Sequence, residues 1–278
     1  MKRTITSREG VGITASVRQK FELYLSRVVT ELPTLVYIKK GIKTLRRDGF
    51  ESIVREGEAV AIAGGQSFDV VNAPAAGDFE ASWLAFHPNI IKQFGETQNS
   101  LKPIEIAFTM TSLKSGFLEA FELATESITT SRSIPSSIAA HRVSEVLLWL
   151  GEYGKRFHIS SQVKLAYKVR SVLNSAPAND WSAANIASQM EISEATLRRK
   201  LALESVSFSE LLIDVRMSHA LSLLQSTDLS IGDIAKEVGY ESASRFAVRF
   251  RNRFGHSPAD FRRNKIQDER IGTIFDRV

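Results

Sequence analysis

Cysteine is absent from this chain of 278 residues. The sequence therefore excludes disulfide bridges, thiolate zinc sites and cysteine nucleophiles, and it fits a reducing compartment. It also lacks any apolar run close to the ~20 residues that a membrane helix needs. No apolar stretch follows the basic N-terminal residues as it would in a signal peptide. We expect a cytoplasmic protein with no membrane partner.

Histidine is scarce, and its distribution argues against a metal centre. The five histidines are all isolated from one another: His87, His141, His158, His219 and His256. A metal-binding barrel would need two or three histidines and a carboxylate around one site. We therefore predict no metal and no cofactor.

An enzyme is the weaker functional alternative, because it would need acid, base or metal groups that converge on one site. The candidates in the predicted strand region are Asp69, Asp78, Glu80 and His87. They form no recognisable catalytic cluster.

The net charge of +5 and the pI of about 9.4 permit binding to a polyanion without requiring it. The clustering of charge is more informative than its sum. Arginine and lysine concentrate at residues 198–200 and 245–253, both on predicted helices. An exposed basic helix face is common, so the charge alone favours an ordinary solvated surface.

The second basic cluster belongs to a helix-turn-helix pattern at residues 230–254. Gly239 stands where a tight turn between two helices needs a residue without a Cβ atom. In the second helix Phe246 and Phe250 share one face, and an arginine stripe that includes Arg245 lies beside it. A cationic helix held against another helix suits the major groove of DNA.

A second copy of this pattern occupies residues 182–201. Its apolar positions match those of the first copy at a nearly constant offset, as Ile186, Ala187, Met190, Leu197 and Leu201 against Ile234, Ala235, Val238, Phe246 and Phe250. Ser193 is a suitable N-cap for its recognition helix. Two degenerate copies with the same core pattern are much stronger support for DNA binding than one.

A long helix is predicted between the two copies. Ser207 and Glu210 form a capping box that starts it. A helix of about eighteen residues is roughly 27 Å long, which is comparable with the ~34 Å repeat of one DNA groove face. Ser257 and Pro258 then predict a final short helix that contains Phe261.

The N-terminal part predicts an antiparallel sandwich or barrel. Short strands are expected at 34–39, 42–47, 50–55, 59–63, 67–72 and 80–86, with turns between them. Residues 115–152 predict two amphipathic helices separated by Pro135. Those helices have two open interpretations, a dimer interface or packing back onto the strands. Residues 151–161 are the expected linker.

These residues resemble the AraC/XylS family of bacterial transcription regulators over residues 163–263. The family-like motif places are Ile234, Ala235, Gly239, Tyr240, Phe246, Phe250, Phe254, Gly255, Ser257, Pro258, Phe261 and Arg262. The likeness extends more loosely to the strands between Pro33 and Phe86. It implies an α+β chain with a small cupin-like antiparallel β-barrel and helices at 1–160. An all-α domain with two helix-turn-helix motifs joined by a long helix would follow at 161–278.

The resemblance also assigns DNA-reading places. In the first recognition helix they are Ala195, Arg198 and Arg199, with Thr196 and Lys200 beside them; in the second they are Ser242, Ala243, Ser244 and Arg245. Alanine offers only methyl contacts, to thymine. Arg251 and Arg253 are expected on phosphates, and Arg249 on either a base or a phosphate. The chain departs from the family pattern at Val248, where the family often has arginine.

The function implied is sequence-specific binding of double-stranded DNA by an activator that works with RNA polymerase. Its N-terminal domain would sense a small molecule or mediate homodimerisation, and control by a protein partner is the alternative. Lys39, Lys40 and Lys43 are the candidate contacts to an anionic effector. Exposed hairpin lysines without a ligand role are the more ordinary explanation for them.

Overall fold

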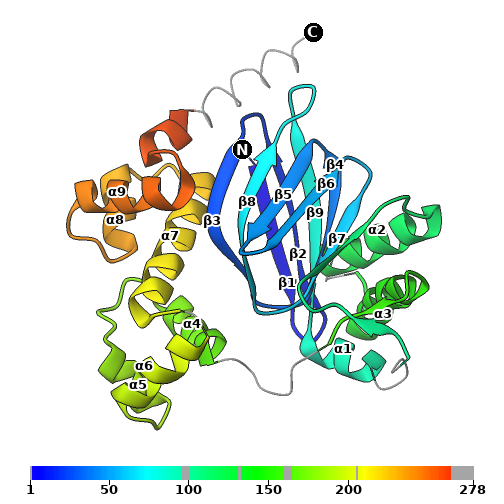
Figure 1. Cartoon of the computed structure of the whole chain (residues 1–278). Coiled ribbons are helices and arrows are strands. Elements are labelled where there is room, and N and C mark those ends of the chain that lie inside the picture. The colour runs from blue at the N-terminus through cyan, green and yellow to red at the C-terminus, as the bar shows by residue number, and fades with distance from the viewer. Residues whose placement is uncertain (1, 96–99, 131–132, 159–164, 205, 264–278) are drawn as a thin grey trace. The chain divides into compact units, whose positions relative to one another are not determined.

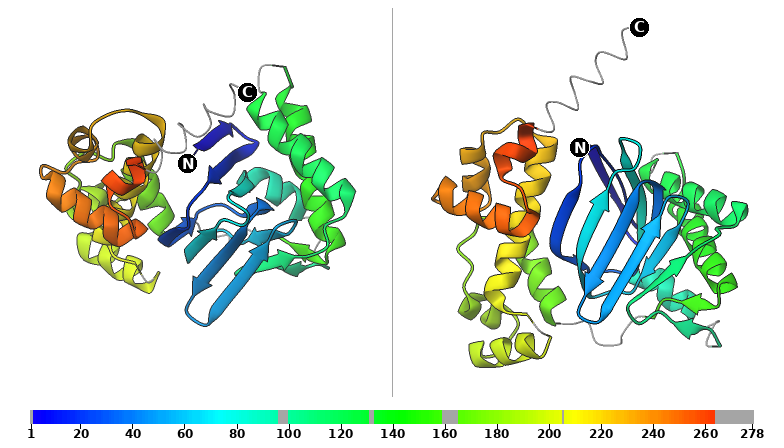
Figure 2. Two further views of the ribbon diagram at one scale, coloured as in Figure 1. Left: turned by 90° about the horizontal axis from the view of Figure 1, so that it is seen from above. Right: turned by 45° about the horizontal axis from the view of Figure 1, so that its top comes forward.

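The computed structural model describes residues 2–95, 100–130, 133–158, 165–204 and 206–263, and the chain divides into two compact units, 1–160 and 161–278 (Figure 1). In their described parts, the first unit combines two large β-sheets and a two-stranded one with three helices, and the second unit is entirely helical (Figures 1 and 2).

The larger sheet of the first unit is antiparallel. In spatial order it consists of β1 (Lys2–Arg8), β2 (Gly12–Gln19), β9 (Phe79–Phe86), β4 (Thr34–Lys40), β7 (Ala59–Ile62) and β11 (Ala107–Met110). The second sheet is also antiparallel, in the order β3 (Leu23–Thr30), β8 (Gln66–Ala73), β5 (Ile42–Arg47) and β6 (Phe50–Arg55). A short parallel pair joins β10 (Lys102–Pro103) to β12 (Lys155–Arg156).

The predicted antiparallel domain is confirmed, but it is not a closed barrel. Among the described strands no pairing joins the two sheets, so the unit is a sandwich. All six predicted strands are present within a residue or two of their expected ends. The prediction was incomplete, because three further strands precede Leu32 and a β-bulge at Arg27 interrupts one of them.

Strand β7 shows how the core is organised. Ala59 and Ala61 face a cluster shared with the helices, whereas Val60 and Ile62 face a cluster shared with the second sheet. Side chains on a strand alternate between its faces, so a strand buried on both faces must be apolar throughout. The central strands of the larger sheet therefore lie between two hydrophobic layers.

Three helices cover the outer face of the larger sheet (Figure 1). They are α1 (Pro88–Gly95), α2 (Ser115–Thr129) and α3 (Ser136–Glu152). Phe117 and Phe121 of α2 and Val143 of α3 are fully buried in the cluster formed with the sheet. The second interpretation of residues 115–152 is thus the observed one for these faces.

The first residues of the linker predicted at 151–161 belong to regular elements instead. Gly151 and Glu152 end α3, and Lys155 and Arg156 form β12. Residues 159–164, where the division between the units falls, lie outside the described part.

Six named helices lie in the described part of the second unit. They are α4 (Leu165–Ser175), α5 (Ala183–Gln189), α6 (Glu194–Leu203), α7 (Phe208–Ser226), α8 (Ile231–Glu237) and α9 (Ala243–Phe254), and helical residues 258–263 follow. The capping box of Ser207 and Glu210 starts α7 as predicted. At 19 residues, α7 is roughly 28 Å long. It joins a core around α4–α6 to a second core around α8 and α9.

Candidate nucleic-acid interface

The two copies of the motif share their turn geometry. Gly239 has φ +81°, and Glu191 holds the equivalent place in the first copy with φ 55°. The next backbone N–H donates to a carbonyl of the preceding helix, at 3.0 Å in the first copy and 2.8 Å in the second. A left-handed residue followed by such a bond ends a helix and reverses the chain. The similarity of the copies is therefore one of backbone shape as well as of apolar pattern.

Serine caps begin both recognition helices. The Ser193 side chain accepts a hydrogen bond from the Thr196 backbone N–H at 3.2 Å, and Ser242 accepts one from Arg245 at 3.3 Å. A serine cap stabilises a helix start by about 1 kcal/mol. Because Ser242 and Ser193 both cap helices, their hydroxyl groups are partly engaged before any ligand arrives.

We call the helices around the α4–α6 core the first lobe and those around the α8–α9 core the second lobe. Each recognition helix buries one face against its own lobe. Leu197 and Leu201 of α6 are fully buried, as are Phe246 and Phe250 of α9. The Phe250 ring lies 5.7 Å from that of Phe246 and 5.9 Å from that of Phe261, centroid to centroid. The opposite faces are free to meet a ligand.

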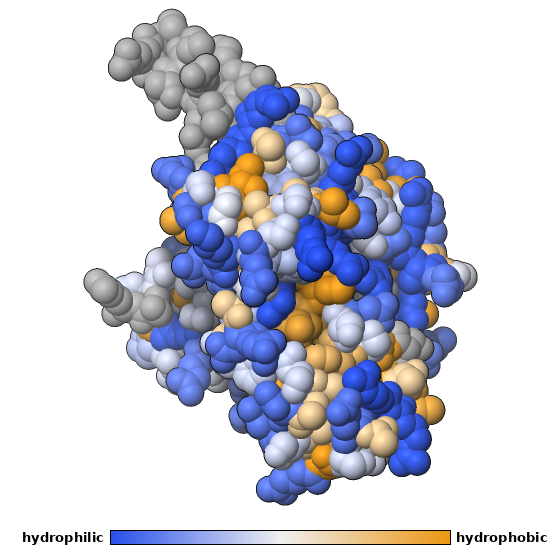
Figure 3. Space-filling view, turned by 90° about the vertical axis from the view of Figure 1, so that its left-hand side faces the viewer, coloured by the Kyte–Doolittle hydropathy of each residue, from blue (hydrophilic) through white to orange (hydrophobic). Residues whose placement is uncertain are grey.

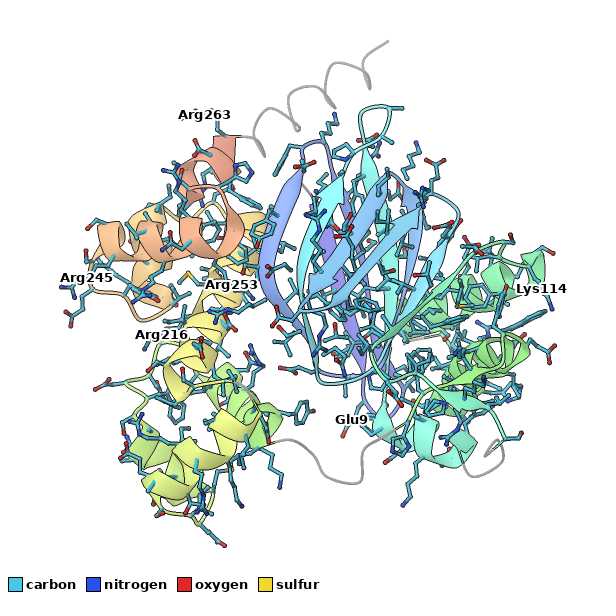
Figure 4. The ribbon with its side chains drawn as sticks, in the orientation of Figure 1. Glu9, Lys114, Arg216, Arg245, Arg253 and Arg263 are labelled. Atoms are coloured by element: carbon cyan, nitrogen blue, oxygen red, sulfur yellow. The ribbon has the colours of Figure 1, made fainter. Side chains whose placement is uncertain are left out.

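Most of the predicted DNA-reading residues lie on these free faces. Exposed residues are Ala195, Arg198, Arg199, Lys200, Ala243, Ser244, Arg245, Arg249 and Arg251, and half-buried ones are Thr196 and Ser242. Arg245 reaches outward from the first turn of α9 in Figure 4. On the face shown in Figure 3, hydrophilic side chains predominate over the helical unit and apolar patches are scattered.

Arg198 and Arg199 differ in their surroundings. The Arg198 guanidinium donates two hydrogen bonds to one carboxylate oxygen of Glu194, at 2.8 and 2.7 Å. Arg199 lies two residues after Leu197 and two before Leu201, so it projects from the centre of the exposed face. Glu194 was not among the predicted site residues, although its i, i+4 spacing to Arg198 is a known signal for an ion pair.

Arg253 lies in the core and not on the exposed face that the predicted phosphate contact requires. Arg253, labelled in Figure 4, is 7% exposed. Its guanidinium forms an ion pair with Asp214 of α7 at 3.1 Å. Phe254 and Phe250 are buried on the same side of α9. The helical stripe that contains Arg245 and Arg249 turns into the core at Arg253, so its expected phosphate contact has no surface position.

Asp214 anchors both lobes to the connecting helix. It is 3% exposed and lies 3.5 Å from Arg170 of α4 as well as 3.1 Å from Arg253 of α9. One carboxylate thus lies between two buried arginines, which come from the first and the last named helices of the unit. Buried charges of this kind are retained only when they are paired.

Arg216 lies two residues after Asp214 on α7 and forms a second anchor. Its side chain donates to the carbonyls of Pro177 and Asn179, at 3.1 and 3.0 Å, and lies over the Tyr240 ring. A Cβ atom on Gly239 would approach the Arg216 guanidinium to 2.7 Å. The loop before α5 and the turn after α8 therefore meet at one side chain of α7 (Figure 4).

Tyr240 adds no charge to this junction, although two arginines lie near it. Burial raises the pKa of the Tyr240 phenol, and the nearby Arg216 and Arg249 act in the opposite direction. Tyr240 therefore stays a neutral phenol at physiological pH. The position of Arg249 near Tyr240 places it at the edge of the exposed face of α9.

The three candidate effector lysines occupy different environments. Lys43 of β5 is half-buried, donates to the Asn72 side-chain oxygen at 2.8 Å and lies over the Phe79 ring. Lys39 is half-buried and Lys40 exposed at the end of β4. Lys43 is thus turned into the sandwich, unlike an ordinary hairpin lysine.

Among the described residues, no group of three acidic or histidine side chains is placed to hold a metal ion. Among the same residues no helix combines the length and the apolarity that crossing a membrane requires.

The second unit defines a tandem helix-turn-helix protein of the DNA-binding type. A helix-turn-helix domain family matches residues 186–264. The regulator YdeO of Escherichia coli K12 is 42% identical over 91 residues, which are 33% of this chain and 36% of YdeO. GadX of the same strain is 36% identical over 106 residues, 38% of this chain and 39% of GadX. The chain therefore contains a helix-turn-helix domain of the AraC/XylS type.

The matched region covers less than half of these relatives, namely 36% of YdeO and 39% of GadX. The whole fold is covered by a solved structure instead. ToxT of Vibrio cholerae with an unsaturated fatty acid bound has a TM-score of 0.67 and 13% sequence identity, over 92% of this chain and 96% of ToxT. At that identity the likeness concerns the fold alone. It confirms an antiparallel β unit followed by a helical unit.

Proposed function

We propose that this protein is a transcription regulator that reads two successive major-groove segments of DNA with α6 and α9. The observation that carries the proposal is the pair of recognition helices with equivalent caps, turns and exposed basic faces. The two helices are joined by α7, which Asp214 and Arg216 fix to both lobes. Arg199 and Arg245 are the proposed base readers, and Arg249 and Arg251 the proposed phosphate contacts.

Selection of binding sites from a library of random DNA duplexes tests this function. The full chain is expected to enrich two short conserved elements whose centres lie about 10 base pairs apart. Binding measured by fluorescence anisotropy should weaken with salt, with a log–log slope of about −0.9 for each phosphate contacted. Enrichment of no sequence would contradict the proposal.

Glu194 is expected to oppose DNA binding. Before Arg198 can contact a phosphate or base it must leave its pair with Glu194, and an exposed pair is worth ~0.2–1 kcal/mol. Glu194→Gln should therefore tighten binding by at most about fivefold and make the salt slope steeper. The Glu152→Gln variant removes one charge from α3 of the other unit and should leave affinity unchanged. Weaker binding by Glu194→Gln would show that its carboxylate contacts the DNA directly.

For the N-terminal unit we propose a small-molecule effector with a carboxylate group. ToxT binds an unsaturated fatty acid within a similar fold, and Lys43 offers an inward-facing cation in this chain. Oleate is expected to raise the melting temperature of the full chain, and the Lys43→Met variant to abolish that rise. Sugars and amino acids in the same screen provide the comparison. A shift retained by Lys43→Met would exclude Lys43 as the carboxylate contact.

The regulatory direction is proposed to be activation through RNA polymerase. Run-off transcription from a promoter that contains the selected site should increase when the full chain is added. The alternative is control by a protein partner in place of a ligand, or by homodimerisation of the N-terminal unit. Pull-down with the full chain tests for a protein partner, and sedimentation analysis tests for a homodimer. A partner that is captured when no ligand raises the melting temperature would favour control by a protein.

A further inference from the structure

Val248 is an exposed apolar side chain in the middle of a cationic recognition helix. It is 60% exposed. It lies two residues after Phe246 and two before Phe250, so it projects about 200° and 160° around the helix axis from the two buried rings. Val248 therefore occupies the centre of the face that α9 presents outward. Exposed Arg245 and Arg251 flank it on either side.

The equivalent place in α6 is Arg199. Leu197 and Leu201 are the buried residues of α6, as Phe246 and Phe250 are those of α9. Arg199 stands between the first pair as Val248 stands between the second. The two lobes thus present different chemistry at the same point of the motif, a guanidinium in one and a branched apolar group in the other.

Helix stability and solubility give no reason for valine at this position. Valine has a lower helix propensity than arginine, lysine or glutamine, because its branched side chain loses rotamer freedom in a helix. Exposure removes any gain from packing in the unbound protein. A contact that Val248 makes only in the complex with DNA would give this side chain a role.

The chemistry of the major groove identifies that contact. Valine has no hydrogen-bonding group, so it cannot pair with the guanine O6 and N7 or the adenine N6 and N7. The 5-methyl group of thymine is the apolar feature that the major groove displays. We propose that Val248 reads a thymine through its 5-methyl group, whereas Arg199 reads a guanine at the equivalent position of the other half-site. This inference rests on the proposed DNA-binding function.

Replacement of thymine by deoxyuridine tests the inference, because it removes the methyl group and keeps base pairing. Each thymine of the selected site is replaced in turn, and affinity for the full chain is measured by anisotropy at one fixed salt concentration. The wild-type protein should lose about fourfold at one thymine in the element read by α9, the effect of one methyl group. Val248→Ala should bind the thymine and deoxyuridine duplexes equally, at the wild-type affinity for the latter, because the shorter alanine side chain at this position does not reach the thymine methyl group.

Arg199→Ala serves as the matched control. It should keep the deoxyuridine effect and instead lose sensitivity to 7-deazaguanine, which lacks the N7 acceptor. Circular dichroism verifies that both variants fold, as expected for exposed positions. A site that is selected but shows the same deoxyuridine profile for Val248→Ala as for the wild type would overturn the role of Val248 and leave the proposed function standing. Selection of no site at all would instead remove the proposed function.

Discussion

Replacement of Asp214 by asparagine is expected to lower the free energy of unfolding of the helical unit by about 3–5 kcal/mol. The reason is that Arg170 and Arg253 would remain buried without the carboxylate that lies 3.5 and 3.1 Å from them. Hydrogen exchange measured by mass spectrometry reports the two units separately. Peptides from residues 165–263 should exchange faster in Asp214→Asn, whereas those from residues 5–157 should not change.

Two comparisons distinguish this mechanism from a general sensitivity of the unit. Asp180→Asn changes an exposed aspartate in the loop before α5 and should leave exchange unaltered. Joint replacement of Arg170 and Arg253 by methionine and Asp214 by leucine should cost less than Asp214→Asn alone, because no uncompensated charge stays buried. An equal or larger loss in the joint variant would mean that the ion pairs themselves supply the stability.

The combined Arg199→Ala and Arg245→Ala variant is expected to lose about 2–6 kcal/mol of binding free energy on the selected DNA site. Each arginine contributes about 1–3 kcal/mol if it reads a base, and effects at separate helices add approximately. Affinity for an unrelated duplex should fall much less, since phosphate contacts by other residues remain. Anisotropy titrations on both duplexes measure the difference.

The matched control for this variant removes two arginines from the other unit. Arg46 and Arg55 are exposed on β5 and β6, and their joint replacement by alanine should leave DNA affinity unchanged. Equal losses on the selected and the unrelated duplex would show that Arg199 and Arg245 contact phosphates only.

Much of the helical unit could be predicted from the sequence, because the signals that define it are local. Ser193, Ser207 and Ser257 each start a helix three residues before the group they cap, and Gly239 adopts the left-handed backbone that its turn requires. Within each helix of the two motifs, the apolar positions lie only one or two helical turns apart. Patterns of this length need no knowledge of distant contacts.

The sandwich was less predictable, because strand pairing is set by residues far apart in the chain. The first strand, Lys2–Arg8, alternates threonine, isoleucine and basic residues and lies at the edge of the larger sheet, so it has no strong apolar pattern. The third strand, Leu23–Thr30, is interrupted by a bulge that shifts its alternation. Neither strand could be recognised without the partners that complete it.

The sequence by itself determined the two recognition helices, their turns and their basic composition, because a helix positions its side chains by a fixed local repeat. Only the tertiary structure decided which of the basic residues face outward. Arg253 continues the arginine stripe of α9 in sequence, yet Asp214 of α7 holds it inside. The pairing of Arg198 with Glu194, by contrast, follows from their spacing within α6. The sequence determines which residues are charged, but the burial of Arg253 and its pairing with Asp214 depend on how α7 and α9 pack.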